Sequence, residues 1–63
     1  MPIYKRKDIE IVESEIENYV GRFWIELVVR AAGAVHIELL NDTCQRHVQI
    51  KAAKRIQEIL DGR

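Results

Sequence analysis

The stretch that decides the fold is residues 22–40, which read RFWIELVVRAAGAVHIELL. As a strand, its first half would place Phe23, Ile25, Leu27 and Val29 on one face and Trp24, Glu26, Val28 and Arg30 on the other. A second alternating run follows at Val35, Ile37 and Leu39. Such alternation, rich in β-branched and aromatic residues, is typical of paired strands. The stretch therefore predicts a β-hairpin, with Gly33 supplying the backbone angle that other residues avoid at the turn.

A single helix over residues 22–40 is the competing interpretation. Arg22, Glu26 and Arg30 are four residues apart, which is the spacing of helical ion pairs. Gly33 would then lie in mid-helix, where it costs about 1 kcal/mol relative to alanine. Because the β-branched residues also disfavour a helix, we favour the hairpin.

Toward the C-terminus the apolar spacing changes from two residues to three and four. Residues 41–43, Asn-Asp-Thr, offer turn and capping chemistry. One helical face then carries Cys44, Val48, Ala52, Ile56, Ile59 and Leu60. This spacing predicts an amphipathic helix that ends near residues 61–62, with Cys44 as a small core residue.

Toward the N-terminus, residues 8–20 are also predicted to form a helix. The apolar residues with helical spacing are Ile9, Val12, Ile16, Tyr19 and Val20. Asp8 is suited to cap this helix and Gly21 to end it. A strand over roughly residues 8–19 is the alternative.

Together these segments predict one α+β domain over residues 1–63. Its order is a helix, a two-stranded antiparallel hairpin and a C-terminal helix, and residues 1–7 precede them as an extended or flexible arm. The alternative is a three-stranded antiparallel sheet plus one helix.

The small size of the chain predicts self-association. A chain of 63 residues buries only about 60% of the surface that it exposes when unfolded. Its one cysteine, Cys44, excludes an internal disulfide. A two-stranded sheet would also leave two open edges. We therefore expect a homo-oligomer, most simply a two-fold dimer that completes the fold.

Charge and hydropathy predict a soluble, cytoplasmic protein. Ten basic and ten acidic residues balance to zero, so no global field favours nucleic acid or membranes. The N-terminus lacks the pattern of a secretory signal. The most apolar stretch, residues 23–40, contains Glu26, Arg30, His36 and Glu38, which are costly in hydrocarbon.

The residues that could carry chemistry are few. Cys44 and His47 are three residues apart, and with His36 they are the candidates for a zinc site or for a nucleophile and its base. A fourth zinc ligand is not evident, and the sequence contains no serine elbow, phosphate-binding glycine loop or cofactor fingerprint. We therefore expect no catalytic residues, no metal and no cofactor.

By exclusion, the sequence predicts a small non-enzymatic protein-interaction or regulatory module that acts as a homo-oligomer. The candidate interface residues are Phe23, Trp24, Val28 and Ile50. The alternative is a nucleic-acid-binding protein that uses the basic side of its C-terminal helix and its N-terminal arm. The candidates for that role are Lys5, Arg6, Lys7, Arg46, Lys51 and Lys54.

The last forty residues or so resemble the second half of a KH-type RNA-binding domain. The resemblance lies in two short strands over residues 23–29 and 35–40, followed by VQIKAAKRIQEIL at residues 48–60. It would imply RNA binding. KH recognition rests on a GXXG loop, however, and no two glycines here have that spacing. No binding residue of that family can therefore be assigned.

Overall fold

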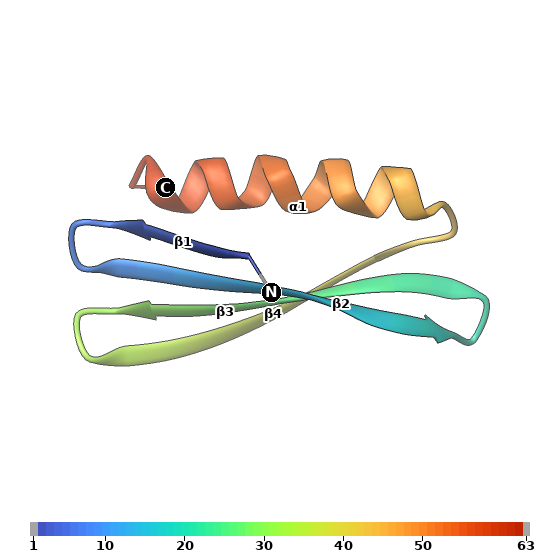
Figure 1. Ribbon diagram of the computed structural model, residues 1–63, viewed down its shortest axis with the longest axis horizontal. Helices are drawn as coiled ribbons and strands as arrows, with labels where there is room; N and C mark the ends of the chain where they lie inside the picture. The colour runs from blue at the N-terminus through green and yellow to red at the C-terminus, as the bar shows by residue number, and fades with distance from the viewer. Residues whose placement is uncertain (1, 63) are drawn as a thin grey trace.

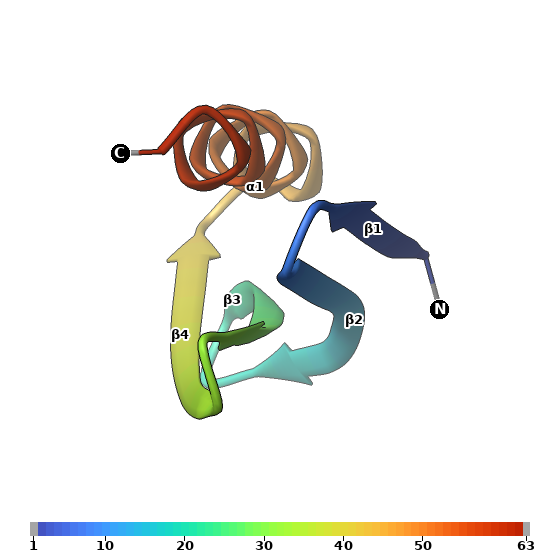
Figure 2. The same cartoon turned by 90° about the vertical axis from the view of Figure 1, so that its left-hand side faces the viewer.

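The structure is a computed structural model that describes residues 2–62. It contains four strands followed by one helix, namely β1 (Ile3–Arg6), β2 (Ile9–Tyr19), β3 (Arg22–Ala31), β4 (Ala34–Asp42) and α1 (Gln45–Leu60). The strands form one antiparallel meander in the order β1-β2-β3-β4. The helix lies along one face of this twisted sheet (Figures 1 and 2). The predicted α+β class is confirmed.

The predicted hairpin is β3 and β4. The register pairs Arg30 with Val35 and Ala31 with Ala34, so only Ala32 and Gly33 form the turn. Gly33 has a φ of 78°, as the hairpin prediction requires. The alternation predicted for β3 is also confirmed, since Ile25, Leu27 and Val29 are buried and the residues between them are not.

The helix predicted over residues 8–20 is wrong, because residues 9–19 form strand β2. In a helix Ile11 would lie off the apolar face, whereas in the strand it is fully buried between β1 and β3. Over residues 9–12, pairing with a strand on each side also satisfies the backbone groups of β2. Gly21, expected to end a helix, instead forms the β2–β3 turn with a φ of 71°.

The N-terminal arm is extended, but it belongs to the sheet. Residues 3–6 form β1 and pair with residues 9–12 of β2. The Glu13 amide continues the contact by donating to the Pro2 carbonyl at 3.0 Å. The three-stranded alternative therefore includes β2 but lacks β1. Strand β1 has only four residues, which is too short to show a clear alternation in the sequence.

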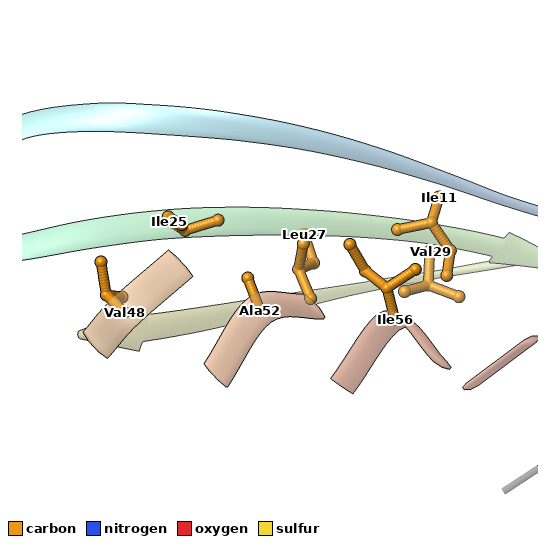
Figure 3. Packing of buried hydrophobic residues seen from close by; sticks show 7 residues of the cluster. All are labelled: Ile11, Ile25, Leu27, Val29, Val48, Ala52 and Ile56. Atoms are coloured by element: carbon orange, nitrogen blue, oxygen red, sulfur yellow. The ribbon is translucent and has the colours of Figure 1, made fainter. Parts of the chain in front are cut away.

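The C-terminal helix is confirmed, and its buried residues close the core. Val48, Ala52 and Ile56 of α1 pack against the sheet (Figure 3). The sheet contributes Ile11, Ile25, Leu27 and Val29. All of these side chains come from one face of the sheet, so the hydrophobic core is a single layer between α1 and the strands.

The expectation that Cys44 belongs to this core is wrong. Cys44 is exposed and has extended backbone angles at the N-cap position of α1, so the helix begins at Gln45. Its amide donates to Asp42 Oδ1 at 3.2 Å. The turn that links β4 to α1 thus includes Cys44 and directs it away from the helical face that packs on the sheet.

Within residues 2–62, no helix is long and apolar enough to cross a membrane.

Candidate functional site: the open face of the sheet

The face of the sheet away from α1 is not covered by any element of residues 2–62 (Figures 1 and 2). Side chains alternate between the two faces of a strand, so the residues between the buried ones project from this side. We call this surface the open face. The strand register assigns to it Ile3, Lys5, Glu10, Val12, Ser14, Ile16, Trp24, Glu26, Val28, Arg30, Val35, Ile37, Leu39 and Asn41.

An apolar row crosses the middle of the open face from one edge of the sheet to the other. The register aligns Ile3 with Val12, Val12 with Val28 and Val28 with Ile37. The two outer residues are largely exposed, at 59% for Ile3 and 57% for Ile37. Residues directly opposite each other in neighbouring strands are in contact distance. The row is therefore a continuous apolar surface.

Strand β4 adds to this surface along the edge of the sheet. Val35, Ile37 and Leu39 are 63%, 57% and 55% exposed. Single exposed apolar residues are common on protein surfaces, but three in succession on one strand face are not scattered. Strand β4 pairs only with β3 and so forms an edge of the sheet. Contiguous apolar surface next to an open strand edge is typical of an association surface.

Charged residues flank the apolar row on both sides. Along β3, Arg30 lies on one side of Val28 and Glu26 on the other, each two residues away. Arg30 Nη1 lies 3.6 Å from Glu10 Oε1 on the neighbouring strand. The apolar row thus lies between Glu26 on one side and the oppositely charged Arg30 and Glu10 on the other.

The structure brings together only two of the four predicted interface residues. Trp24 and Val28 lie on the open face. Phe23 projects from the other face of β3 and packs, half-buried, against the core. Ile50 is 50% exposed on the outer side of α1. Phe23 and Ile50 therefore cannot contribute to the same surface as Trp24.

Sequence reasoning missed most of the open face. Val35, Ile37 and Leu39 were recognised as a strand face, but not as the uncovered one. Both faces of the hairpin carry apolar residues, so alternation alone does not show which face the helix covers. The sequence of β3 does distinguish the two faces, because Glu26 and Arg30 share a face with Val28. Two charges on one face indicate the face that the helix leaves open.

The predicted basic residues do not form one surface. Lys5 lies on the open face and Lys7 in the β1–β2 turn, whereas Arg46 and Lys54 are exposed on α1. Arg6 contacts the end of α1, where Arg6 Nη1 donates to Asp61 Oδ1 at 2.9 Å. The predicted stripe is therefore divided among different sides of the molecule.

The remaining basic candidate, Lys51, is bound within the fold. Its Nζ donates to Asn41 O at 3.1 Å and lies 3.0 Å from Asp42 Oδ2. The ammonium of Lys51 and the amide of Cys44 together lower the pKa of Asp42 from 3.8 to about 2. These contacts join the end of β4 to the first half of α1.

A second polar contact joins α1 to β4. Arg55 Nε and Nη2 donate to the two oxygens of Glu38 at distances of 2.6 to 3.0 Å. This bidentate bond lowers the pKa of Glu38, although partial burial acts in the opposite direction. Both charges are used to hold the helix on the sheet, so the pair is structural.

The candidates for chemistry are separated. His36 precedes Asp42 by six residues of β4, which is about 20 Å at the rise of a strand, whereas Cys44 and His47 lie at the start of α1. Among the side chains of residues 2–16 and 20–62, no group of three or more histidine, cysteine, aspartate or glutamate residues is placed to hold a metal ion.

A hollow between the β1–β2 and β3–β4 turns has mixed charge. Its lining includes Lys5, Lys7, Asp8, Glu10 and Arg30. The two carboxylates balance most of the positive charge, and the remaining lining is mainly the alanine and glycine residues in and beside the β3–β4 turn. This arrangement favours neither an anion nor a cation.

Comparisons of the chain with protein-family models, with curated proteins and with solved structures found no match. The resemblance to KH-type domains is therefore not supported by a family match.

Proposed function

We propose that this chain is a non-enzymatic protein-interaction module that associates with itself through the open face of its sheet. The observation that carries the proposal is the uninterrupted apolar row from Ile3 to Ile37, with Val35 and Leu39 beside it on the edge strand. Covering such a surface removes apolar area from water, which contributes a favourable term of about 25 cal/mol per Å² against the entropic cost of association.

The size of the open face supports a protein partner. Neighbouring strands lie about 4.8 Å apart and rise about 3.3 Å per residue. Three strands of at least nine residues and one of four therefore outline roughly 500 Å². Projecting side chains make the accessible area larger than this outline. The accessible area of the open face is therefore comparable with the 800 Å² or so that each partner contributes to a stable interface.

Self-association also fits the one-sided core. Among the described residues, the buried hydrophobic side chains lie between α1 and the sheet, and no further element packs on the opposite face. Two sheets that pack face to face form the second layer for each other, at a spacing of about 10 Å. One contact between copies would thus supply the burial that a 63-residue chain lacks.

The test is a pair of matched substitutions. Ile37 on the open face and Ile50 on the outer side of α1 are the same residue type with similar exposure, 57% and 50%. Analytical ultracentrifugation of the unmodified protein should give twice the 7.4 kDa chain mass. Ile37→Lys should raise the dimer dissociation constant at least about 100-fold, because it buries a charge at the interface. Ile50→Lys should leave it unchanged.

Two results would contradict the proposal. One is an unmodified protein that stays monomeric over the whole micromolar range. The other is an equal loss of association in both variants, since association would then not depend on the open face. Circular dichroism spectra of both variants check that the fold is intact.

Nucleic-acid binding receives less support from the structure. Lys51 and Arg6 are paired with carboxylates, and the other basic candidates lie on different sides of the molecule. Phosphate contacts would appear as an affinity for single-stranded RNA that falls steeply with added salt. Such an affinity, lost in Lys51→Glu/Lys54→Glu, would favour this alternative.

A further inference from the structure

We propose that the second copy packs on the open face with its strands reversed, so that Arg30 of each copy faces Glu26 of the other. This inference rests on the proposed self-association and adds the orientation of the two copies. It also names the residues that select the partner.

The side chains of the open face lie in rows across the sheet. Val28 lies beside Ile37 in the apolar row. On one side of this row Arg30 lies beside Val35, and on the other side Glu26 lies beside Leu39. Successive rows are two residues apart along each strand, or about 6.6 Å. On β3 and β4 the three rows are therefore basic and apolar, apolar only, and acidic and apolar, and the first row continues through Glu10 of β2 and Lys5 of β1.

Two-fold symmetry limits how two such faces can meet. The axis that relates two sheets packed face to face lies in the plane between them. An axis along the apolar row reverses the strand direction and exchanges the two flanking rows. The apolar row then meets itself, Arg30 meets Glu26 of the second copy, and Val35 meets Leu39 of the second copy. On β3 and β4, each row thus meets a row of complementary chemistry.

The dimensions permit these contacts. Stacked sheets lie about 10 Å apart, a gap that an arginine and a glutamate can bridge together. Symmetry creates each pair twice, so one dimer contains two Arg30–Glu26 contacts. Arg30 is exposed and Glu26 is half-buried in the single chain, which leaves Arg30 able to reorient toward a second copy. Its contact with Glu10, at 3.6 Å, is too long for a hydrogen bond.

The other in-plane axis fits less well. An axis parallel to the strands would place β1 over β4 and bring Lys5 onto Val35 of the second copy. Strand β1 has only four residues, so Leu39 would have no counterpart. Arg30 would meet Glu10 of the second copy in that arrangement. The reversed arrangement is therefore the one that covers the exposed apolar residues of β4, and Glu10 distinguishes the two by experiment.

Charge reversal tests the orientation directly. Arg30→Glu places like charges opposite Glu26 of the second copy, and Glu26→Arg places like charges opposite Arg30. Each single variant should raise the homodimer dissociation constant at least about tenfold. An equimolar mixture of the two variants should form heterodimers with near-original affinity, because both contacts are then attractive. The two variants differ in mass, so native mass spectrometry can count each species.

Matched controls separate this pair from other charge effects. The double variant Arg30→Glu/Glu26→Arg should again form homodimers, since both contacts are restored with reversed sign. Arg30→Glu/Glu10→Arg restores only a contact within one chain and should stay weak. Lys54→Glu changes a charge on the exposed side of α1 and should have no effect. Formation of the heterodimer also shows that both single variants fold.

The possible failures are distinguishable. If the unmodified protein is monomeric, the proposed function itself fails. If it is a dimer but the charge reversals at residues 26 and 30 leave the dissociation constant unchanged, only the orientation is overturned. Rescue of Arg30→Glu by Glu10→Arg instead of Glu26→Arg would also overturn it, and would indicate the axis parallel to the strands.

Discussion

Asp42 shows how one carboxylate can join two elements. It is the last residue of β4, and its Oδ1 accepts the Cys44 amide at 3.2 Å while its Oδ2 lies 3.0 Å from Lys51 Nζ. His47 Nδ1 lies 3.7 Å from the same side chain. The Lys51 ammonium and the Cys44 amide favour the ionised carboxylate in the folded state, which lowers the pKa of Asp42 to about 2.

The lowered pKa of Asp42 predicts how stability depends on pH. Ionised Asp42 contributes its full stabilisation above its unfolded pKa of 3.8, and this contribution is lost as the pH falls through the folded pKa of about 2. The melting temperature of the unmodified protein should therefore exceed that of Asp42→Asn above pH 5 or so, and the difference should shrink between about pH 4 and pH 2. Thermal melts across this range measure it. A difference that stays constant to about pH 2 would contradict the assignment.

At the scale of elements, the tight turns explain how a short chain forms a long meander. Strands β2 and β3 are joined by residues 20–21 and strands β3 and β4 by residues 32–33, and all four residues have positive φ angles between 50° and 78°. Two positive φ angles define the turn whose twist matches a β-hairpin. The first position in each turn is Val20 or Ala32, neither of which favours this region.

A substitution in the β3–β4 turn should therefore stabilise the fold. Ala32→Asn should stabilise the fold by roughly 0.5–1 kcal/mol, because asparagine tolerates a positive φ angle better than alanine does. The melting temperature should rise by a few degrees. Ala34→Asn is the matched control, since Ala34 begins β4 and is also exposed. Equal effects of the two substitutions would contradict this explanation of the turn.

The N-terminal half shows why residues 8–20 could not be assigned from sequence. Their apolar residues fit a helix about as well as a strand, and Glu13 and Glu15 argue against a strand with one buried face. In the structure these two acids lie on the side that faces α1. Glu13 accepts a hydrogen bond from Tyr4 Oη at 3.1 Å, and Glu15 accepts one from Gln49 Nε2 at 3.2 Å. Both donors lie at least nine residues away in the sequence, so a local pattern cannot reveal them.

The hairpin and the C-terminal helix were predictable because the apolar residues of each fit a single secondary structure. They alternate every two residues in the hairpin and recur every three or four residues in the helix. The site was predictable only in part. Trp24 and Val28 were identified as candidates, but Ile3 and the exposed residues of β4 were not. Their importance depends on which face α1 covers, which is a property of the assembled fold.

At the scale of the whole molecule, the two faces of the sheet have different roles. One face forms the buried core with α1, and the other carries exposed apolar residues that no described element covers. Leu27 and Leu39 illustrate the contrast, because they are fully buried and 55% exposed, respectively. The same substitution at the two sites should therefore affect different properties.

Leu27→Ala should lower the free energy of unfolding by about 3 kcal/mol per chain, since it creates a cavity in the core between α1 and the sheet. Leu39→Ala should lower it by about 1 kcal/mol or less, and its main effect should be weaker self-association. Urea unfolding followed by circular dichroism at two protein concentrations separates the two effects. Comparable losses of stability at both sites would contradict this contrast, because Leu39 would then be as buried in the single chain as Leu27 is.

The order of elements along the chain also has a consequence for biosynthesis. Each strand pairs with its neighbour in sequence, so the meander can assemble from successive hairpins as the chain emerges from the ribosome. Helix α1 follows all four strands, and until it emerges the nascent sheet exposes apolar side chains on both sides. During that interval the growing polypeptide is most susceptible to aggregation and to capture by chaperones.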